Sequence, residues 1–246
     1  MPATAAQPER RLDLPPAYTL VRLRETGDAH AHACRIAPQA GAGTFVQVGR
    51  FDLIEFAVVL EPEEPLQQAR RALFAGLVAL GDAIAAHCPP EKEYVWEWPA
   101  GLRFDGARIG GARLAWPEEC REDEVPGWLV FSVQLIAAHV GAFEPGQAPG
   151  STTLEEEGLE DGRAIIESFT RYLMLAFDLW AGRGFDALGE RYLEHLPQVK
   201  AGTERSIAEN GDLVLRLYGR EPERVPLLPA LERPSWYDPE RGGPRL

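Results

Sequence analysis

The most informative stretch of this sequence is EWPAGLRFDGARIGGARLAW, residues 97–116. Two β-rich runs, 102–104 and 109–115, flank the dipeptide Asp105-Gly106. An Asp-Gly pair favours the two-residue turn of a β-hairpin, because both turn positions need a positive φ. The stretch therefore predicts a β-hairpin.

The second strand of this hairpin contains the pair Gly110-Gly111. Glycine has no Cβ, so a flat or extended ligand could lie directly against the backbone there. Paired glycines also relieve crowding in a twisted hairpin. The sequence leaves both explanations open.

Helical and strand patterns surround the hairpin on both sides. Apolar residues at steps of three and four predict helices at 28–37, 66–87, 161–181 and 185–195. Runs of β-branched and aromatic residues predict strands at 44–48, 53–60, 94–98 and 128–140. The nearly continuous apolar content of 128–140 is typical of a strand buried on both faces, in the centre of a sheet. The order of elements defines an α+β fold with a mixed β-sheet flanked by helices.

The chain divides into four predicted segments. Residues 1–16 lack the apolar core of a secretory signal and predict a disordered lead. Residues 17–200 form the main domain, and residues 201–234, with an Asn210-Gly211 turn, form a small C-terminal β unit. Residues 235–246 are expected to be a tail, and the Pro/Gly-rich segment 143–150 a loop.

Composition argues against several classes of function. The net charge of -13 would repel phosphate backbones, so nucleic-acid binding is not expected. No apolar run approaches the roughly 20 residues that cross a bilayer, so no membrane partner is expected. The cysteines Cys34, Cys88 and Cys120 form no CxxC motif, which predicts neither a disulfide framework nor a zinc site and fits a cytoplasmic location.

The ordered motifs resemble those of the biotin/lipoate A/B protein ligase family. Residues 97–116 are similar to the family's W-P-N-D, strand, D/N-G-x-K, small-Gly, strand pattern. The segment STTLEEEG at 151–158 resembles T-S-L-x-x-E-G, and DLWAGRGFDALGERYLEHL at 178–196 resembles the family's helix pair with a Gly-Phe junction. The resemblance spans roughly residues 19–231 and implies the fold shared by class II aminoacyl-tRNA synthetases and biotin protein ligases.

The family activates biotin or lipoate with ATP and transfers the acyl group to a lysine of a carrier domain. The resemblance therefore implies a small-molecule ligand, ATP with biotin or lipoate as cofactors, and a biotinyl or lipoyl carrier domain as a partner. A sheet edge often pairs two copies in this fold, so a homodimer is also an expectation.

Several positions differ from the family's chemical motifs. The lysine after the hairpin turn is replaced by Arg108, which keeps the charge but differs in reach and geometry. The Gly/Arg-rich phosphate loop is reduced to Gly49-Arg50, and the Asn-Asp after Trp-Pro is replaced by Ala100-Gly101. The family's later G-x-G-x-N strand is replaced by a run that begins at Ser132.

The resemblance assigns catalysis, if present, to Arg108, and ligand binding to Arg50, Trp98, Gly110, Gly111 and Ser132. Trp98 could stack on a ligand ring or pack in the core. His30 and Cys34 would share one helix face, but no metal site is predicted. Glu55 is interpreted as part of a solvated acidic rim.

Three functions follow as hypotheses. The first is a divergent ligase-like protein that binds an acyl or nucleotide-like molecule in the hairpin cleft, with the ligase residues largely replaced. The second is an active ATP-dependent ligase or transferase that modifies a carrier-domain lysine. The third is a non-catalytic module that binds a carrier protein.

Overall fold

The computed structural model describes residues 11–140, 150–159 and 161–246. Its main sheet has the strand order β1-β2-β3-β7-β6-β5-β4. The strands are β1 (Thr19–Leu23), β2 (Thr44–Val48), β3 (Leu53–Leu60), β4 (Tyr94–Glu97), β5 (Gly101–Phe104), β6 (Ala107–Ala115) and β7 (Leu129–Ile136). β1 and β2 pair in parallel, and the other neighbours pair antiparallel. The predicted mixed sheet and the central position of the strand after residue 128 are confirmed.

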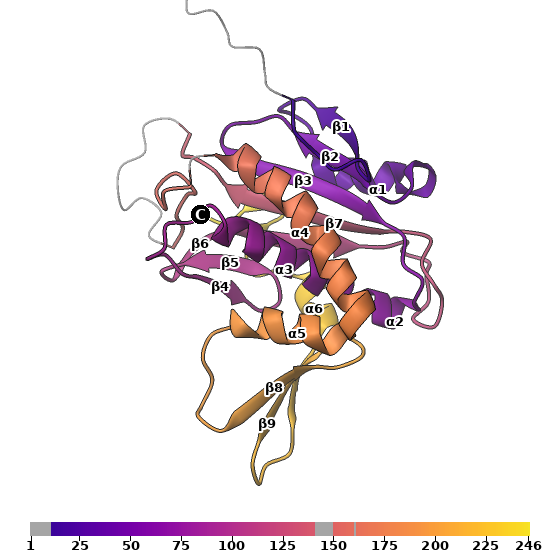
Figure 1. The fold of residues 1–246 in the computed structure, drawn as a ribbon, viewed down its shortest axis with the longest axis vertical. Coiled ribbons are helices and arrows are strands. Elements are labelled where there is room, and N and C mark those ends of the chain that lie inside the picture. Colours follow the sequence, from indigo (N-terminus) through magenta and orange to yellow (C-terminus); the bar gives the residue numbers. More distant parts are fainter. Residues whose placement is uncertain (1–10, 141–149, 160) are drawn as a thin grey trace, which may run out of the picture.

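Helices cover both faces of this sheet (Figure 1). They are α1 (Ala29–Ala40), α2 (Leu66–Ala69), α3 (Ala72–Ala85), α4 (Gly162–Arg183), α5 (Phe185–Glu194) and α6 (Leu227–Glu232). In Figure 1, α3 and α4 lie in front of the sheet, and α1 lies behind its upper edge. The first of these faces holds most of the hydrophobic core, including the rings of Phe56 and Phe131, which both pack against Phe169.

The two faces follow from the alternation of side chains along each strand. In β3, Phe56 and Val58 pack in the core under α3 and α4, whereas Ala57 and Val59 pack under α1. Three alanines of α1 at four-residue steps, Ala29, Ala33 and Ala37, complete this second, smaller cluster. The hydrophobic layer between the sheet and α1 is therefore the smaller of the two, and this sheet face also carries buried polar residues.

Three local features differ from the sequence prediction. The sequence predicted no strand at 19–23, yet β1 pairs there with β2 at the sheet edge. Helix α1 continues past Pro38 to Ala40, because a proline in the last turn removes a single helical hydrogen bond. The helix predicted at 66–87 breaks into α2 and α3 at Arg70, whose buried guanidinium pairs with Glu122 and stacks on Trp116.

The predicted small C-terminal β unit is confirmed. β8 (Thr203–Ile207), β9 (Leu213–Leu217) and β10 (Glu223–Val225) form an antiparallel sheet below the main sheet in Figure 1. The expectation of a tail beyond residue 234 does not hold. Residues 235–246, called here the C-terminal segment, form the short strands β11 (Tyr237–Asp238) and β12 (Gly243–Pro244) and bury Trp236 to 1% exposure.

The predicted disordered lead is also partly packed. Within residues 11–16, Asp13 forms an ion pair with Arg171 of α4 at 2.6 Å. Residues 1–10, and residues 143–149 of the predicted loop, lie outside the described residues. No helix of the described part of the chain is long and apolar enough to cross a membrane.

Candidate functional site

The β5–β6 hairpin places two arginines side by side. Its turn residues Asp105 and Gly106 both have positive φ, 45° and 83°, as the Asp-Gly pair predicted. The register then shifts between Leu102 and Arg103, so that Arg103 pairs with Arg108 across the hairpin. This bulge turns both guanidinium groups to the same face of the sheet as Gly101 and Gly111.

Glu97 of β4 joins these arginines into one charged cluster. Its carboxylate accepts a hydrogen bond from Arg103 Nε at 2.5 Å and lies 3.6 Å from an amino nitrogen of Arg108. It also accepts a 2.5 Å hydrogen bond from Ser235 Oγ. Burial raises the pKa of Glu97, but the hydrogen bonds from Ser235 and Arg103 outweigh burial and lower the pKa overall. Glu97 is therefore ionised at neutral pH.

Gly110 and Gly111 face different neighbours. Gly110 has a φ of 144°, and a Cβ on it would lie 2.1 Å from the backbone oxygen of Gln134 in β7. Relief of crowding therefore explains this glycine. A Cβ on Gly111 would lie 2.4 Å from Ala100 O and 2.6 Å from the ring of Trp236. The flat group that lies against Gly111 is thus an indole of the same chain.

We call the sheet face that carries Arg108 and Gly111 the hairpin face. The C-terminal segment covers it: the Arg113 guanidinium lies 4.3 Å from the centre of the Tyr237 ring, and Gln134 Nε2 donates to Gly242 O at 3.3 Å. The sequence prediction missed both Glu97 and Trp236 as site residues. Neither belongs to a family motif. Trp236 contacts Gly111, which is distant in the sequence, whereas Glu97 contacts Arg103 only 6 residues away, in a pairing that no motif marks.

Ser132 lies on the same sheet face but in a second cluster, beneath α1. His30 Nδ1 is 2.8 Å from Ser132 Oγ, and Cys34 Sγ is 3.9 Å from His30 Nε2. Burial, helped by the charge of Arg113, lowers the pKa of His30 to about 4, and burial raises the pKa of Cys34 to about 11. At neutral pH both side chains are uncharged, so this cluster contains a neutral imidazole and a protonated thiol.

Glu55 also belongs to this second cluster, which corrects its interpretation as a solvated residue. It is 2% exposed, and its carboxylate accepts a 2.8 Å hydrogen bond from the backbone N–H of Ala29. Its position opposite Gln134 in the ladder puts it on the face covered by α1. Burial raises its pKa above the usual range.

Arg50 lies in the β2–β3 loop, as expected from the pattern, but carboxylates surround it. It donates to both carboxylate oxygens of Asp52, at 2.7 and 2.6 Å, and lies 3.5 Å from Glu55. A cavity of about 230 Å³ opens beside it and is also lined by Arg22 and Arg163. The positive charge of Arg50 is thus largely compensated within the protein.

Trp98 is not brought together with Arg108. Its ring packs against Phe74 of α3 and Tyr192 of α5, with ring centres 6.0 and 6.2 Å apart. The ring therefore belongs to the core between the sheet and the helices, which was the alternative explanation for this residue.

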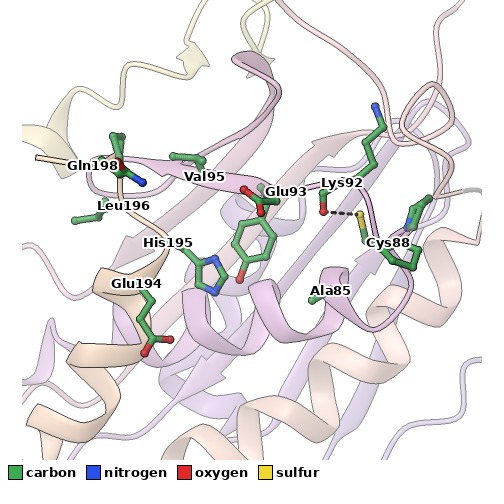
Figure 2. A pocket seen from close by; sticks show the side chains of 13 residues that line it. Ala85, Cys88, Lys92, Glu93, Val95, Glu194, His195, Leu196 and Gln198 are labelled. Atoms are coloured by element: carbon green, nitrogen blue, oxygen red, sulfur yellow. Dashed lines mark hydrogen bonds between the residues drawn. The ribbon is translucent and has the colours of Figure 1, made fainter.

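A larger cavity of about 560 Å³ lies between β4, the end of α3 and the residues after α5 (Figure 2). His195 stacks on Tyr94 there, with ring centres 4.3 Å apart. Burial raises the pKa of the Cys88 thiol, and its Sγ lies 3.8 Å from the backbone oxygen of Lys92. This cavity therefore contains no activated thiol. Within the described residues, no cluster of three His, Cys, Asp or Glu side chains could hold a metal ion.

Comparison with known proteins places this architecture among biotin protein ligases. A structure of a biotin protein ligase-like protein of unknown function from a Silicibacter species is 26% identical, with a TM-score of 0.75, over 90% of this chain and 99% of that one. Biotin protein ligase from Aquifex aeolicus in complex with biotin and ATP is 14% identical, with a TM-score of 0.61, over 84% and 94%. Biotin protein ligase from Leishmania major in complex with biotin is 15% identical, with a TM-score of 0.52, over 86% and 99%.

The fold is therefore that of the biotin protein ligases. The family model of the biotin/lipoate A/B protein ligase family matches residues 14–194, and the chain belongs to this family. No curated protein matches the sequence significantly.

Proposed function

We propose that the protein is a divergent member of this family that binds a small acyl compound or a nucleotide-like molecule on the hairpin face, with the residues of the ligase reaction largely replaced. The observation that carries the proposal is the position of Arg108. Its side chain is 17% exposed, lies on the same face as Gly111, and is held by Glu97. A fixed, partly buried cation beside a glycine backbone that presents no Cβ suits a ligand with an anionic end and a flat or extended body.

The charge balance of the cluster supports an anionic ligand. Arg103 and Arg108 carry two positive charges, and Glu97 compensates one of them. Arg108 Nε is buried and has no hydrogen-bond partner among the described residues. A carboxylate or phosphate oxygen is the group that a guanidinium donor binds best. Solved relatives of the same fold are described with biotin bound, and biotin carries a carboxylate at one end of an extended chain.

Adenylation is the less favoured alternative. Activating a carboxylate with ATP requires positive charge that neutralises the phosphates. The nearest counterpart of the family's phosphate loop is Arg50, which is already paired with Asp52 and lies close to Glu55. The contacts of Arg50 therefore favour binding without adenylation. For the third hypothesis, no contact among the described residues gives specific support to binding of a carrier domain.

Thermal shift measurements with biotin, lipoate and octanoate, each with and without ATP, test the proposal. Wild type should be stabilised by at least one acid, and Arg108→Ala should lose this effect. The matched control is Arg121→Ala, because Arg121 is 70% exposed on its side chain and pairs with Asp123 away from the site. Trp236→Ala is tested in parallel, so that the C-terminal segment does not mask binding. ATP is also tested alone, and if neither the acids nor ATP stabilise wild type or Trp236→Ala, the proposed function is wrong.

The same panel distinguishes the two alternatives. ATP–pyrophosphate exchange that depends on an acid and is lost in Arg108→Ala would show an active ligase and replace the proposal. Stabilisation by a biotinyl or lipoyl carrier domain alone, without any small molecule, would show an interaction module instead.

A further inference from the structure

The strands of the C-terminal segment are not part of the main sheet. Among the described residues, β11 and β12 pair only with each other. Three of the segment's backbone hydrogen bonds are local: Tyr237 to Pro234, Gly242 to Asp238 and Arg245 to Trp236. The segment can therefore leave the hairpin face without breaking any hydrogen bond between the strands of the main sheet.

The hydrogen bonds that hold the segment to the hairpin face are side-chain contacts. Ser235 donates to Glu97 at 2.5 Å, and Gln134 donates to Gly242 O at a long 3.3 Å. Two rings add contacts, Trp236 on Gly111 and Tyr237 on Arg113, and the buried residues of β12 lie against β6 and β7. Trp236 is the largest buried side chain of the segment, so we take its indole as the principal anchor.

The fit between the segment and the hairpin face leaves polar atoms unpaired. Trp236 Nε1, Gln134 Oε1 and Arg108 Nε are all buried, and none has a hydrogen-bond partner within the described residues. Buried donors and acceptors are normally paired, and leaving them unpaired opposes burial. An occupant that paired the Arg108 and Gln134 atoms would complement this face better than the indole does.

From these contacts we propose that the C-terminal segment is a displaceable occupant of the hairpin face, anchored by Trp236, and that a ligand binds to Arg108 and Gly111 only when the segment leaves. The exclusion is steric, because the Trp236 ring lies directly against the Gly111 backbone. The ligand part rests on the proposed function, whereas displacement of the segment is a property of the chain alone.

Amide hydrogen exchange of the intact protein, followed by NMR, tests the displacement without any ligand. The N–H groups of Gly242 and Arg245 are bonded within the segment, whereas the N–H of Ala112 in β6 is bonded to Ala100 O. The segment amides should exchange at least about 100-fold faster than Ala112, because a local opening exposes them while the sheet stays intact. Exchange of the segment as slow as that of Ala112 would show a fixed part of the fold and overturn the proposal.

Isothermal titration with octanoate, lipoate and biotin tests the exclusion. Trp236→Ala should bind the acid at least about tenfold more tightly than wild type, because the cost of displacing the anchor is removed. The control Tyr218→Ala removes an aromatic ring that is fully exposed and should leave the affinity unchanged. If Trp236→Ala does not fold, Tyr237→Ala replaces it and should tighten binding in the same direction, since it removes the contact with Arg113.

The outcomes separate this inference from the proposed function. An acid bound equally by wild type and Trp236→Ala would overturn the exclusion and leave the proposed function standing. Fast exchange of the segment, together with no binding of any acid or of ATP to any variant, would support displacement and overturn the proposed function.

Discussion

The indole ring of Trp236 lies against the backbone of Gly111, so that a Cβ at position 111 would come within 2.6 Å of two ring atoms. Gly111 belongs to the predicted ligand hairpin, and Trp236 lies among the last residues of the chain. Their contact means that the hairpin face accommodates a flat ring, and that this ring is supplied by the protein itself. Any ligand bound at Gly111 has to compete with Trp236.

Replacement of Trp236 should cost less stability than replacement of an equally buried tryptophan in the main core. Trp96 lies in the main hydrophobic core and is 0% exposed. Trp96→Ala should therefore lower the free energy of unfolding by about 3–5 kcal/mol. Trp236→Ala can lose no more than the free energy that docks the segment, about 1–2 kcal/mol if the segment opens locally. Urea unfolding followed by circular dichroism measures both. Equal losses would contradict a weakly docked segment.

Gly111→Ala should destabilise the protein and do so partly through Trp236. The new Cβ meets Ala100 O at 2.4 Å and the indole at 2.6 Å, which predicts a loss of about 1–3 kcal/mol from overpacking. Gly127→Ala is the control, because nothing lies within 4 Å of a Cβ there. In the double variant Gly111→Ala/Trp236→Ala, part of the loss should disappear. Strict additivity of the two losses would show that the residues do not interact.

His30 should make the protein less stable in mild acid. Its pKa is about 4 in the folded protein against 6.5 in the unfolded chain, so only the unfolded chain gains the proton between these values. The stabilisation is present above pH 6.5 and is lost as the pH falls towards 4, by up to about 3 kcal/mol.

The variant His30→Gln should remove this component of the pH dependence. His32→Gln is the comparison on the same helix, because His32 is only partly buried and is hydrogen-bonded to Arg35. Burial and the charge of Arg35 lower the pKa of His32 as well, so His32→Gln should change the slope in the same direction but less than His30→Gln does. Unfolding free energies at several pH values between 4 and 7 provide the comparison. An unchanged slope in His30→Gln would mean that His30 is not buried as a neutral side chain.

We expect Arg108 to bind the ligand through directed hydrogen bonds as well as through its charge. If the guanidinium binds an oxyanion through two N–H groups, Arg108→Lys keeps the charge but loses this pair of parallel donors. The substitution should therefore weaken binding by roughly tenfold. Arg108→Ala should weaken it by roughly 100-fold or more, since a charge-assisted hydrogen bond contributes about 1.5–3 kcal/mol. Titration of both variants with the acid that stabilises wild type measures these ratios. Tighter binding or catalysis in Arg108→Lys would instead favour the ligase alternative.

Much of the fold could be predicted because its signals are local. The limits of β2 and β3 agree with the predicted 44–48 and 53–60. Turn-forming residues bound these β-rich runs: Gly41 and Gly43 before β2, Gly49 between the strands, and Pro62 after β3. The Asp105-Gly106 turn was predictable for the same reason. Glu55 carried a usable signal as well, because strand alternation puts it on the same face as Ala57 and Val59, which are buried under α1.

The rest of the site depends on contacts that no local pattern marks. The final segment SWYDPERGGPRL has neither helical nor strand periodicity, so nothing local indicates that Trp236 is buried. Glu97 appears in the sequence as one more charged residue of a strand, and its role emerges only when the bulge aligns Arg103 with Arg108. The contact of Trp236 with Gly111 lies outside any local window, and the pairing of Glu97 with Arg103 depends on a bulge that the sequence does not mark.

A crystal structure of the protein with the acid that gives the largest thermal shift would show whether the ligand replaces the C-terminal segment. The acid should lie beside Gly111 with its carboxylate on Arg108, and residues 235–246 should have left the hairpin face. An acid bound elsewhere, for example in the cavity beside His195, with Trp236 still against Gly111, would contradict this replacement of the segment.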